Sequence, residues 1–185
     1  MNIRSILKTT LILCLAVVFF GCSHIPKKTT VPSSPDDGVV GRVLDSASLR
    51  QGGKILIIPF TAGEGVAATD DLDKISLRLV RGLSVALEGQ QKFVVLSGDK
   101  AQDADFVIKG RIVRVKEKKG MPQFLKARTA MRYLSVEGEV VARKGSQTLA
   151  YFSNEAKNRD QSEKLEIMAE RLGTNIGEFI LKAIQ

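Results

Sequence analysis

Apolar and polar positions follow several different patterns between residues 52 and 185, and each pattern predicts a different element. Residues 52–60, GGKILIIPF, form a continuous apolar run, which is typical of a strand covered on both faces. In residues 69–89, leucine and isoleucine recur at spacings of three and four, which predicts an amphipathic helix ending at a left-handed Gly89. KFVVLS at 92–97 predicts a second strand, and the helical crossover between the two strands implies that they lie parallel.

Longer segments alternate with a period of two, which predicts strands with one polar face. In residues 103–118, Ile108 and Ile112 share one face, while Lys109 and Arg111 share the other. Residues 129–142 alternate in the same way. The sequence RKGS then predicts a tight turn, and QTLAYFSNEA returns as the hairpin partner.

The last apolar stripe runs through residues 162–184 and predicts a helix with Ser162 as its N-cap. Gly173 and Gly177 lie four apart on it, a spacing that allows close approach of a strand or a partner helix. Simple packing of this helix against the sheet is the favoured alternative.

These elements give the order β-α-β-β-β-β-α, with a short helical turn near residues 99–102. The predicted fold is a single α/β (α+β) domain, with a mixed sheet of about five strands and helices packed on the sheet. The domain is expected to span residues 51–185, long enough for one compact core.

The N-terminus predicts export. Residues 1–8 carry two basic side chains and no acid, and residues 9–21 are apolar but too short to span a bilayer. Gly21 and Cys22 end this run, and the arrangement resembles the lipobox of bacterial lipoproteins, with phenylalanines where Leu and a small residue are usual. The resemblance implies cleavage after residue 21 and a diacylglyceryl group on Cys22. An uncleaved anchor, or a cleaved signal with an incidental cysteine, is the alternative.

The segment 22–50 is expected to be the lipidated Cys22 followed by a flexible polar linker, because it is rich in proline, serine and threonine. Several acyl chains on one residue anchor a protein stably. By resemblance to lipoprotein sorting in Gram-negative bacteria, Ser23 implies the periplasmic face of the outer membrane. The chain carries a net charge of +8, and loss of residues 1–21 removes two positive charges and no acid, which leaves +6.

A basic exported domain favours anionic lipids, cell-wall carboxylates or an acidic protein partner. Nucleic acid is not an expected partner, since the chain has no Trp and two Tyr with which to stack bases. The composition therefore adds to the case for a partner in the cell envelope.

No arrangement of residues predicts an enzyme, and no catalytic residue, metal or cofactor is expected. His24, the chain's single histidine, falls in the linker, which excludes histidine-based catalysis or zinc ligation in the domain. Asp103 and Asp105 lack the spacing of a calcium loop. Glu137 and Glu139 lie two apart on a strand's outer face, where a solvated surface is the favoured interpretation.

The most distinctive surface stretch is RVKEKKGMPQFLKAR at 114–128, which joins two predicted strands. Apolar side chains rimmed by positive charge suit a membrane surface or a partner's groove. The alternative is a solvated loop whose apolar residues tuck back onto the core. The candidate interaction residues are Lys116, Lys118, Lys119, Met121, Phe124, Leu125, Lys126 and Arg128.

With the lipobox and tether, the segments ILIIPF, KFVVLS and ADFVIKGRIVRV resemble a known set of envelope lipoproteins. The chain is similar to the α/β domain shared by the curli secretion channel lipoprotein, the lipoprotein activators of penicillin-binding proteins and the N-terminal domain of TolB. The resemblance implies a non-enzymatic adaptor or activator that docks a periplasmic partner, such as a cell-wall synthase or an export assembly. A structural or oligomeric accessory subunit of a secretion or surface apparatus is the alternative, with self-assembly through sheet edges or the last helix.

Overall fold

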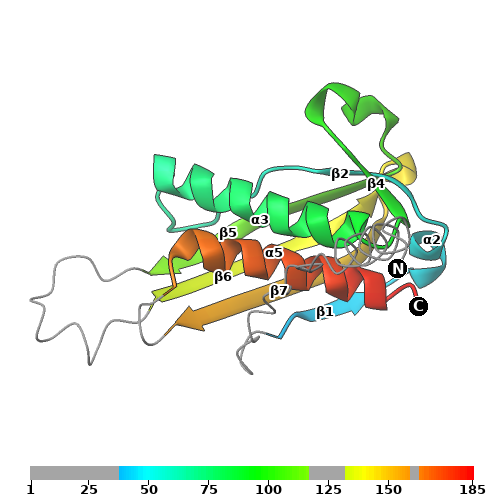
Figure 1. The fold of residues 1–185 in the computed structure, drawn as a ribbon. Helices are drawn as coiled ribbons and strands as arrows, with labels where there is room; N and C mark the ends of the chain where they lie inside the picture. Colours follow the sequence, from blue (N-terminus) through cyan, green and yellow to red (C-terminus); the bar gives the residue numbers. More distant parts are fainter. Residues whose placement is uncertain (1–37, 117–131, 159–162) are drawn as a thin grey trace, which may run out of the picture. The chain divides into compact units, whose positions relative to one another are not determined.

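A seven-stranded mixed sheet with helices packed on one of its faces forms the body of the protein (Figure 1). The computed structural model describes residues 38–116, 132–158 and 163–185. The strands are β1 (Val40–Val43), β2 (Gly53–Ile57), β3 (Thr61–Ala62), β4 (Phe93–Leu96), β5 (Phe106–Lys116), β6 (Arg132–Ala142) and β7 (Thr148–Asn158). The helices are α2 (Ser46–Arg50), α3 (Asp70–Glu88) and α5 (Leu165–Lys182), with 3-10 turns η1 (Gly98–Asp103) and η2 (Lys144–Ser146).

The sheet confirms the predicted α/β class with a mixed sheet in a single domain. Its strands follow the order β1-β7-β6-β5-β2-β4, and β3 pairs with β5. β2 lies parallel to β4, as the helical crossover predicts, and it also lies parallel to β5. The pairs β5–β6, β6–β7 and β7–β1 are antiparallel. The five strands of the prediction are β2, β4, β5, β6 and β7, in the predicted order around α3 and α5. The described helices cover β2 on one face and not on both as expected, since Ile55 and Ile57 are buried and Lys54 is exposed.

The structure differs from the prediction at residues 40–50, which were expected to be linker. Val40–Val43 forms β1 and pairs antiparallel with β7, so that Val40 lies opposite Ser153. The next turn becomes α2, where Asp45 accepts a hydrogen bond from the Ser48 amide at 3.0 Å and Leu49 is fully buried. A four-residue strand is too short to show a period, so its place is decided by pairing with β7 rather than by its own pattern.

Alternation along β5 sets the two faces of the sheet. Ile108 and Ile112 are buried under the helices, and Lys109 and Arg111 point to the other side, as predicted. A bulge after Ile112 then shifts the register. Such a bulge adds one residue to one strand, so Arg114 rather than Val115 joins the outward-facing set.

The long helix α3 begins and ends for separate physical reasons. Thr69 is its N-cap, and its hydroxyl accepts a hydrogen bond from the Leu72 amide at 3.3 Å. The prediction of a left-handed cap at Gly89 is wrong, because this residue has a φ of −59°. The positive φ falls two residues later at Gln91, at 56°. The N-cap of α5 is Lys164, which makes no side-chain cap hydrogen bond, and not the predicted Ser162, which lies outside the described residues.

The helices α3 and α5 lie side by side on the sheet and approach each other closely through glycine (Figure 1). A Cβ on Gly173 would overlap the carbonyl oxygen of Leu79, and a Cβ on Gly82 would overlap that of Glu170. One turn on, a Cβ on Gly177 would lie 2.5 Å from the Ala86 Cβ. Of the alternatives that the sequence left open for Gly173 and Gly177, close approach of a partner helix is correct, and α3 is that helix.

Candidate functional site

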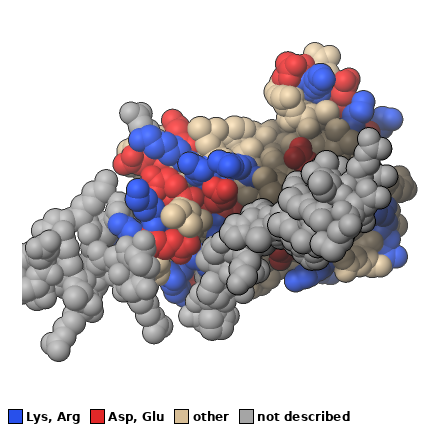
Figure 2. Space-filling view, in the orientation of Figure 1, with Lys and Arg blue, Asp and Glu red and all other residues tan. Residues whose placement is uncertain are grey.

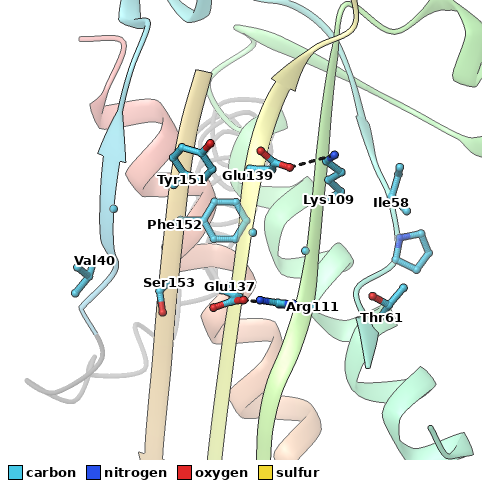
Figure 3. Close-up of a pocket in the computed structure, with 14 residues that line it drawn as sticks. Val40, Ile58, Thr61, Lys109, Arg111, Glu137, Glu139, Tyr151, Phe152 and Ser153 are labelled. Atoms are coloured by element: carbon cyan, nitrogen blue, oxygen red, sulfur yellow. Dashed lines mark hydrogen bonds and ion pairs between the residues drawn. The ribbon is translucent and has the colours of Figure 1, made fainter. Parts of the chain in front are cut away.

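The side of the sheet that α3 and α5 do not cover, here called the open face, carries a shallow groove of about 780 Å³ (Figure 3). Side chains from β5, β6 and β7 line its middle, with β1 on one side and the β2–β3 connection on the other. Val40, Ile58 and Tyr151 are 76%, 40% and 50% exposed there. Apolar side chains gathered on one exposed face are typical of an interaction surface.

Two cross-strand ion pairs cross the groove between β5 and β6. Lys109 Nζ lies 3.1 Å from Glu139 Oε1, and Arg111 contacts Glu137 directly (Figure 3). The register places each pair directly opposite across the two strands. Opposite charges in that position stabilise strand pairing by roughly 0.2–1 kcal/mol.

The carboxyl group of Glu139 is held ionised. The Thr148 hydroxyl donates a hydrogen bond to its Oε2 at 2.7 Å, and this bond lowers the pKa of Glu139 below its usual value. Burial acts in the opposite direction, and Lys109 adds to the lowering. A general acid near neutral pH needs a raised pKa, so the lowered pKa of Glu139 does not suit this carboxyl to that role.

A row of glycines and phenylalanines supports the floor of the groove from the helix side. Gly110 lies opposite Gly138, and Cβ atoms there would lie 2.5 Å from Phe60 Cε1 and 2.6 Å from Phe152 Cζ, respectively. The two rings contact each other, with centroids 6.3 Å apart. Gly41 on β1 continues the row in the same way. Because the rings press directly on backbone, this part of the sheet is fixed by packing.

A second polar cluster lies on the open face near the end of β5. The Tyr133 hydroxyl donates to Glu155, and Lys157 Nζ contacts the same carboxylate at 2.6 Å. Arg114 and Lys157 also lie over the Tyr133 ring, at 5.4 and 5.7 Å from its centroid. Burial raises the pKa of Tyr133, and the hydrogen bond to Glu155 raises it further, so the phenol stays protonated.

The charged groups of the two ion pairs and of the Tyr133 cluster on the open face are engaged with one another. Its glutamates are each in contact with a cation, and its phenol is neutral. Over residues 38–116, 132–158 and 163–185, no cluster of His, Cys, Asp and Glu could hold a metal ion. Asp105 accepts a hydrogen bond from the Lys54 amide at 2.9 Å and thereby links the starts of β5 and β2.

Most of the residues singled out from the sequence fall where the structure gives no description. The predicted lipidation site Cys22 lies outside the described residues, and so do Lys118, Lys119, Met121, Phe124, Leu125, Lys126 and Arg128. Lys116 is described: it is exposed, ends β5 and lies opposite Tyr133. In the part of the chain that the structure describes, no helix is both long and apolar enough to cross a membrane.

Sequence reasoning did not find the open face as a site. Alternation correctly placed Lys109, Arg111, Glu137 and Glu139 on an outer face. It gave no reason to bring Val40 and Ile58 beside them, because those residues come from a segment predicted as linker and from a strand expected to be covered on both sides.

Comparisons with known proteins show the fold. No protein-family model matches the chain, and no curated protein matches it. The PelC dodecamer of Paraburkholderia phytofirmans matches with a TM-score of 0.52 and 12% identity, over 80% of this chain and 97% of that one. A variant of that dodecamer, in a second crystal form, gives 0.54 and 12%, over 80% and 99%. Lipoprotein GNA1162 from Neisseria meningitidis is more distant, with a TM-score of 0.45 and 9% identity over 70% of this chain and 96% of that one.

At 12% identity the two dodecamer matches show a shared α/β fold and nothing further. The specific resemblance to the curli channel, the penicillin-binding-protein activators and TolB stays a prediction.

Proposed function

We propose that this protein is a non-enzymatic, lipid-anchored component of the bacterial envelope, held on the periplasmic face of the outer membrane. It acts as an adaptor or activator that docks an envelope complex, such as a cell-wall synthase or an export assembly, through its open face. The observation that carries the proposal is the groove of about 780 Å³, with exposed Val40, Ile58 and Tyr151 beside paired charges.

The charges on the groove favour a protein partner over a small substrate. Lys109 and Arg111 are already matched by Glu139 and Glu137, so a ligand has to fit around fixed ion pairs. A shallow groove with exposed apolar groups among ordered charges has the composition of a protein interface, in which charge fixes register and burial of apolar groups supplies affinity.

The proposal of a lipid anchor depends on the N-terminal residues. The short apolar run at 9–21, the basic start and Cys22 behind Gly21 support acylation at that cysteine. We expect Cys22→Ser to abolish acyl labelling and to release the protein from the membrane fraction. A Cys22→Ser protein that is still processed and still membrane-bound contradicts the anchor.

A second candidate function, a structural accessory subunit that assembles with copies of itself, is supported by a separate observation. Two of the fold matches are dodecamers, at TM-scores of 0.52 and 0.54. Mass measurement of the detergent-solubilised full-length protein separates the two functions, since a monomer excludes a self-assembling subunit.

The docking proposal is tested with the double substitution Ile58→Ser and Tyr151→Ser in the full-length protein. Both side chains are at the surface, so the fold is expected to survive. We expect the variant to lose the envelope proteins that co-purify with the unaltered protein. Leu44→Ser is the matched control, because Leu44 is 47% exposed and does not line the groove. If the unaltered protein, the double variant and Leu44→Ser recover the same envelope proteins in equal amounts, docking through the open face is contradicted.

A further inference from the structure

Among the described residues of the open face, basic side chains outnumber acidic ones. The glutamates described there are each in contact with a lysine or arginine. The strand registers place further basic residues on the same side, opposite Tyr151, Val94, Ser135 and Tyr133. These residues are Arg42, Lys54, Arg114 and Lys116. Within the described residues Arg42, Lys54 and Lys116 make no ion pair, whereas the charge of Arg114 acts on Glu155 and lowers the pKa of that carboxyl. The open face is therefore positively charged overall.

The outward side of α3 and α5, here called the helix face, has the opposite balance. Acidic and basic side chains lie close together on this side (Figure 2). Lys74 contacts Asp71, and Arg78 and Arg81 share Glu170. Lys182 is a basic residue of these helices without an acidic contact among the described residues. More acidic than basic residues of these helices have no oppositely charged contact among the described residues. These acids are Asp73, Glu88, Glu166 and Glu178.

Both faces also expose large apolar side chains. On the helix face, Leu77, Val85 and Ile167 are 62%, 61% and 51% exposed. These values are similar to those of Val40 and Tyr151 on the open face. Contact between the two faces would remove both sets from water and would bring opposite charges together.

One copy cannot make this contact with itself, because the faces lie on opposite sides of one sheet (Figure 1). We propose that the helix face of one copy packs on the open face of the next. This rests on the second candidate function, a subunit that assembles with copies of itself, and it names the two faces through which the copies pack. The contact is heterologous: every copy inside the assembly uses both faces, and a ring or a filament results, depending on whether the rotation between copies closes.

Cysteine cross-linking of the full-length protein in detergent tests the arrangement. Leu77→Cys places a thiol on the helix face and Tyr151→Cys places one on the open face; both positions are exposed. With a flexible bis-maleimide, the double variant is expected to give a ladder of dimer, trimer and higher species. Each single variant, and the unaltered protein with its native cysteines, is expected to give no ladder.

The single variants separate the alternatives. A double variant that stays monomeric after cross-linking overturns the proposal. A dimer formed by Leu77→Cys alone overturns it as well, because it shows an isologous contact between helix faces.

Charge reversal adds a test of the stated complementarity. Arg42→Glu with Lys54→Glu is expected to reduce the ladder at least tenfold. Adding Glu166→Lys and Glu178→Lys to that chain is expected to restore it, because the signs of both faces are then exchanged. A ladder unaffected by the first pair, or not restored by the second, contradicts docking by opposite charge.

Failure of this inference differs from failure of the proposed function. A protein that gives no ladder, while Ile58→Ser with Tyr151→Ser still abolishes co-purification of another envelope protein, refutes only self-packing. A protein that gives no ladder and loses no partner on that substitution refutes docking through the open face as a whole. A protein that binds anionic phospholipid vesicles through Arg42 and Lys54, and gives no ladder, identifies a membrane as the occupant and overturns the proposal.

Discussion

Replacing Gly173 by alanine tests whether the contact between α3 and α5 is as close as the structure places it. A Cβ at this position would overlap the Leu79 carbonyl oxygen, and it would also crowd the Leu83 amide nitrogen at 2.9 Å. Both obstacles are backbone atoms of α3, so no side-chain rotation relieves them. The helices have to move apart over the buried core below them.

The magnitude follows from two opposing terms. Overpacking of this kind costs up to about 3 kcal/mol, and replacing glycine by alanine inside a helix returns about 1 kcal/mol. We therefore expect Gly173→Ala to lower the free energy of unfolding by about 2 kcal/mol. For a domain of this size that is a fall in Tm of roughly 4–8 °C.

The assay is urea unfolding followed by circular dichroism, with two comparison variants. Gly177→Ala should cost less, because its obstacle is the Ala86 methyl group rather than backbone. Gly89→Ala should be neutral or stabilising by about 0.4–1 kcal/mol, since φ there is −59° and the nearest atom lies 3.4 Å from the added Cβ. The reasoning is refuted if Gly173→Ala is as stable as the unaltered protein.

Three further outcomes follow from the contacts described. Phe152→Ala removes a buried ring that packs on Gly138 and should lower the free energy of unfolding by about 3–5 kcal/mol, measured by urea unfolding; a loss below about 1 kcal/mol contradicts the packing. Arg171→Met leaves the Glu163 carboxylate, 17% exposed and 2.8 Å from Arg171 Nη2, without that cation, and should cost about 3 kcal/mol; an unchanged midpoint contradicts the pair. Glu139 has a folded pKa below its ordinary value of 4.5, so its contribution to stability is full above pH 4.5 and is lost as the pH falls through the lowered pKa. Thr148→Val removes the hydroxyl that lowers this pKa and should reduce the loss of stability, measured by unfolding between neutral and acidic pH. The same pH dependence in the variant and the unaltered protein contradicts the cause assigned.

The parts of the fold that repeat a period over many residues were predictable from sequence. The buried stripe of α3 and the alternation of β5 and β6 each extend over several turns or residue pairs, so core and surface separate along the sequence. β1 and β3 have four and two residues, and their positions depend on pairing with strands distant in sequence. The pattern of apolar and polar residues also does not reveal the bulge after Ile112 or the left-handed backbone of Gln91, because neither feature repeats along the sequence.

The candidate site was predictable only in fragments. The outward positions of Lys109 and Glu139 followed from alternation, but their ion pair depends on the register between β5 and β6. That neither α3 nor α5 lies over the open face is a property of the whole topology, since both of these long helices pack on the same side of the sheet. A strand pattern read alone does not say which helix covers which face.

The central claim, that the open face is the docking surface, is tested most directly by photo-cross-linking in the intact envelope. A photoreactive phenylalanine analogue replaces Tyr151 in the full-length protein, and the same analogue replaces Leu44 as the control, since the two positions are 50% and 47% exposed. Mass spectrometry of the adduct identifies either an envelope protein or a second copy of this chain. We predict a discrete adduct from position 151 and none from position 44. The same products from both positions, or no adduct from position 151, would contradict the claim.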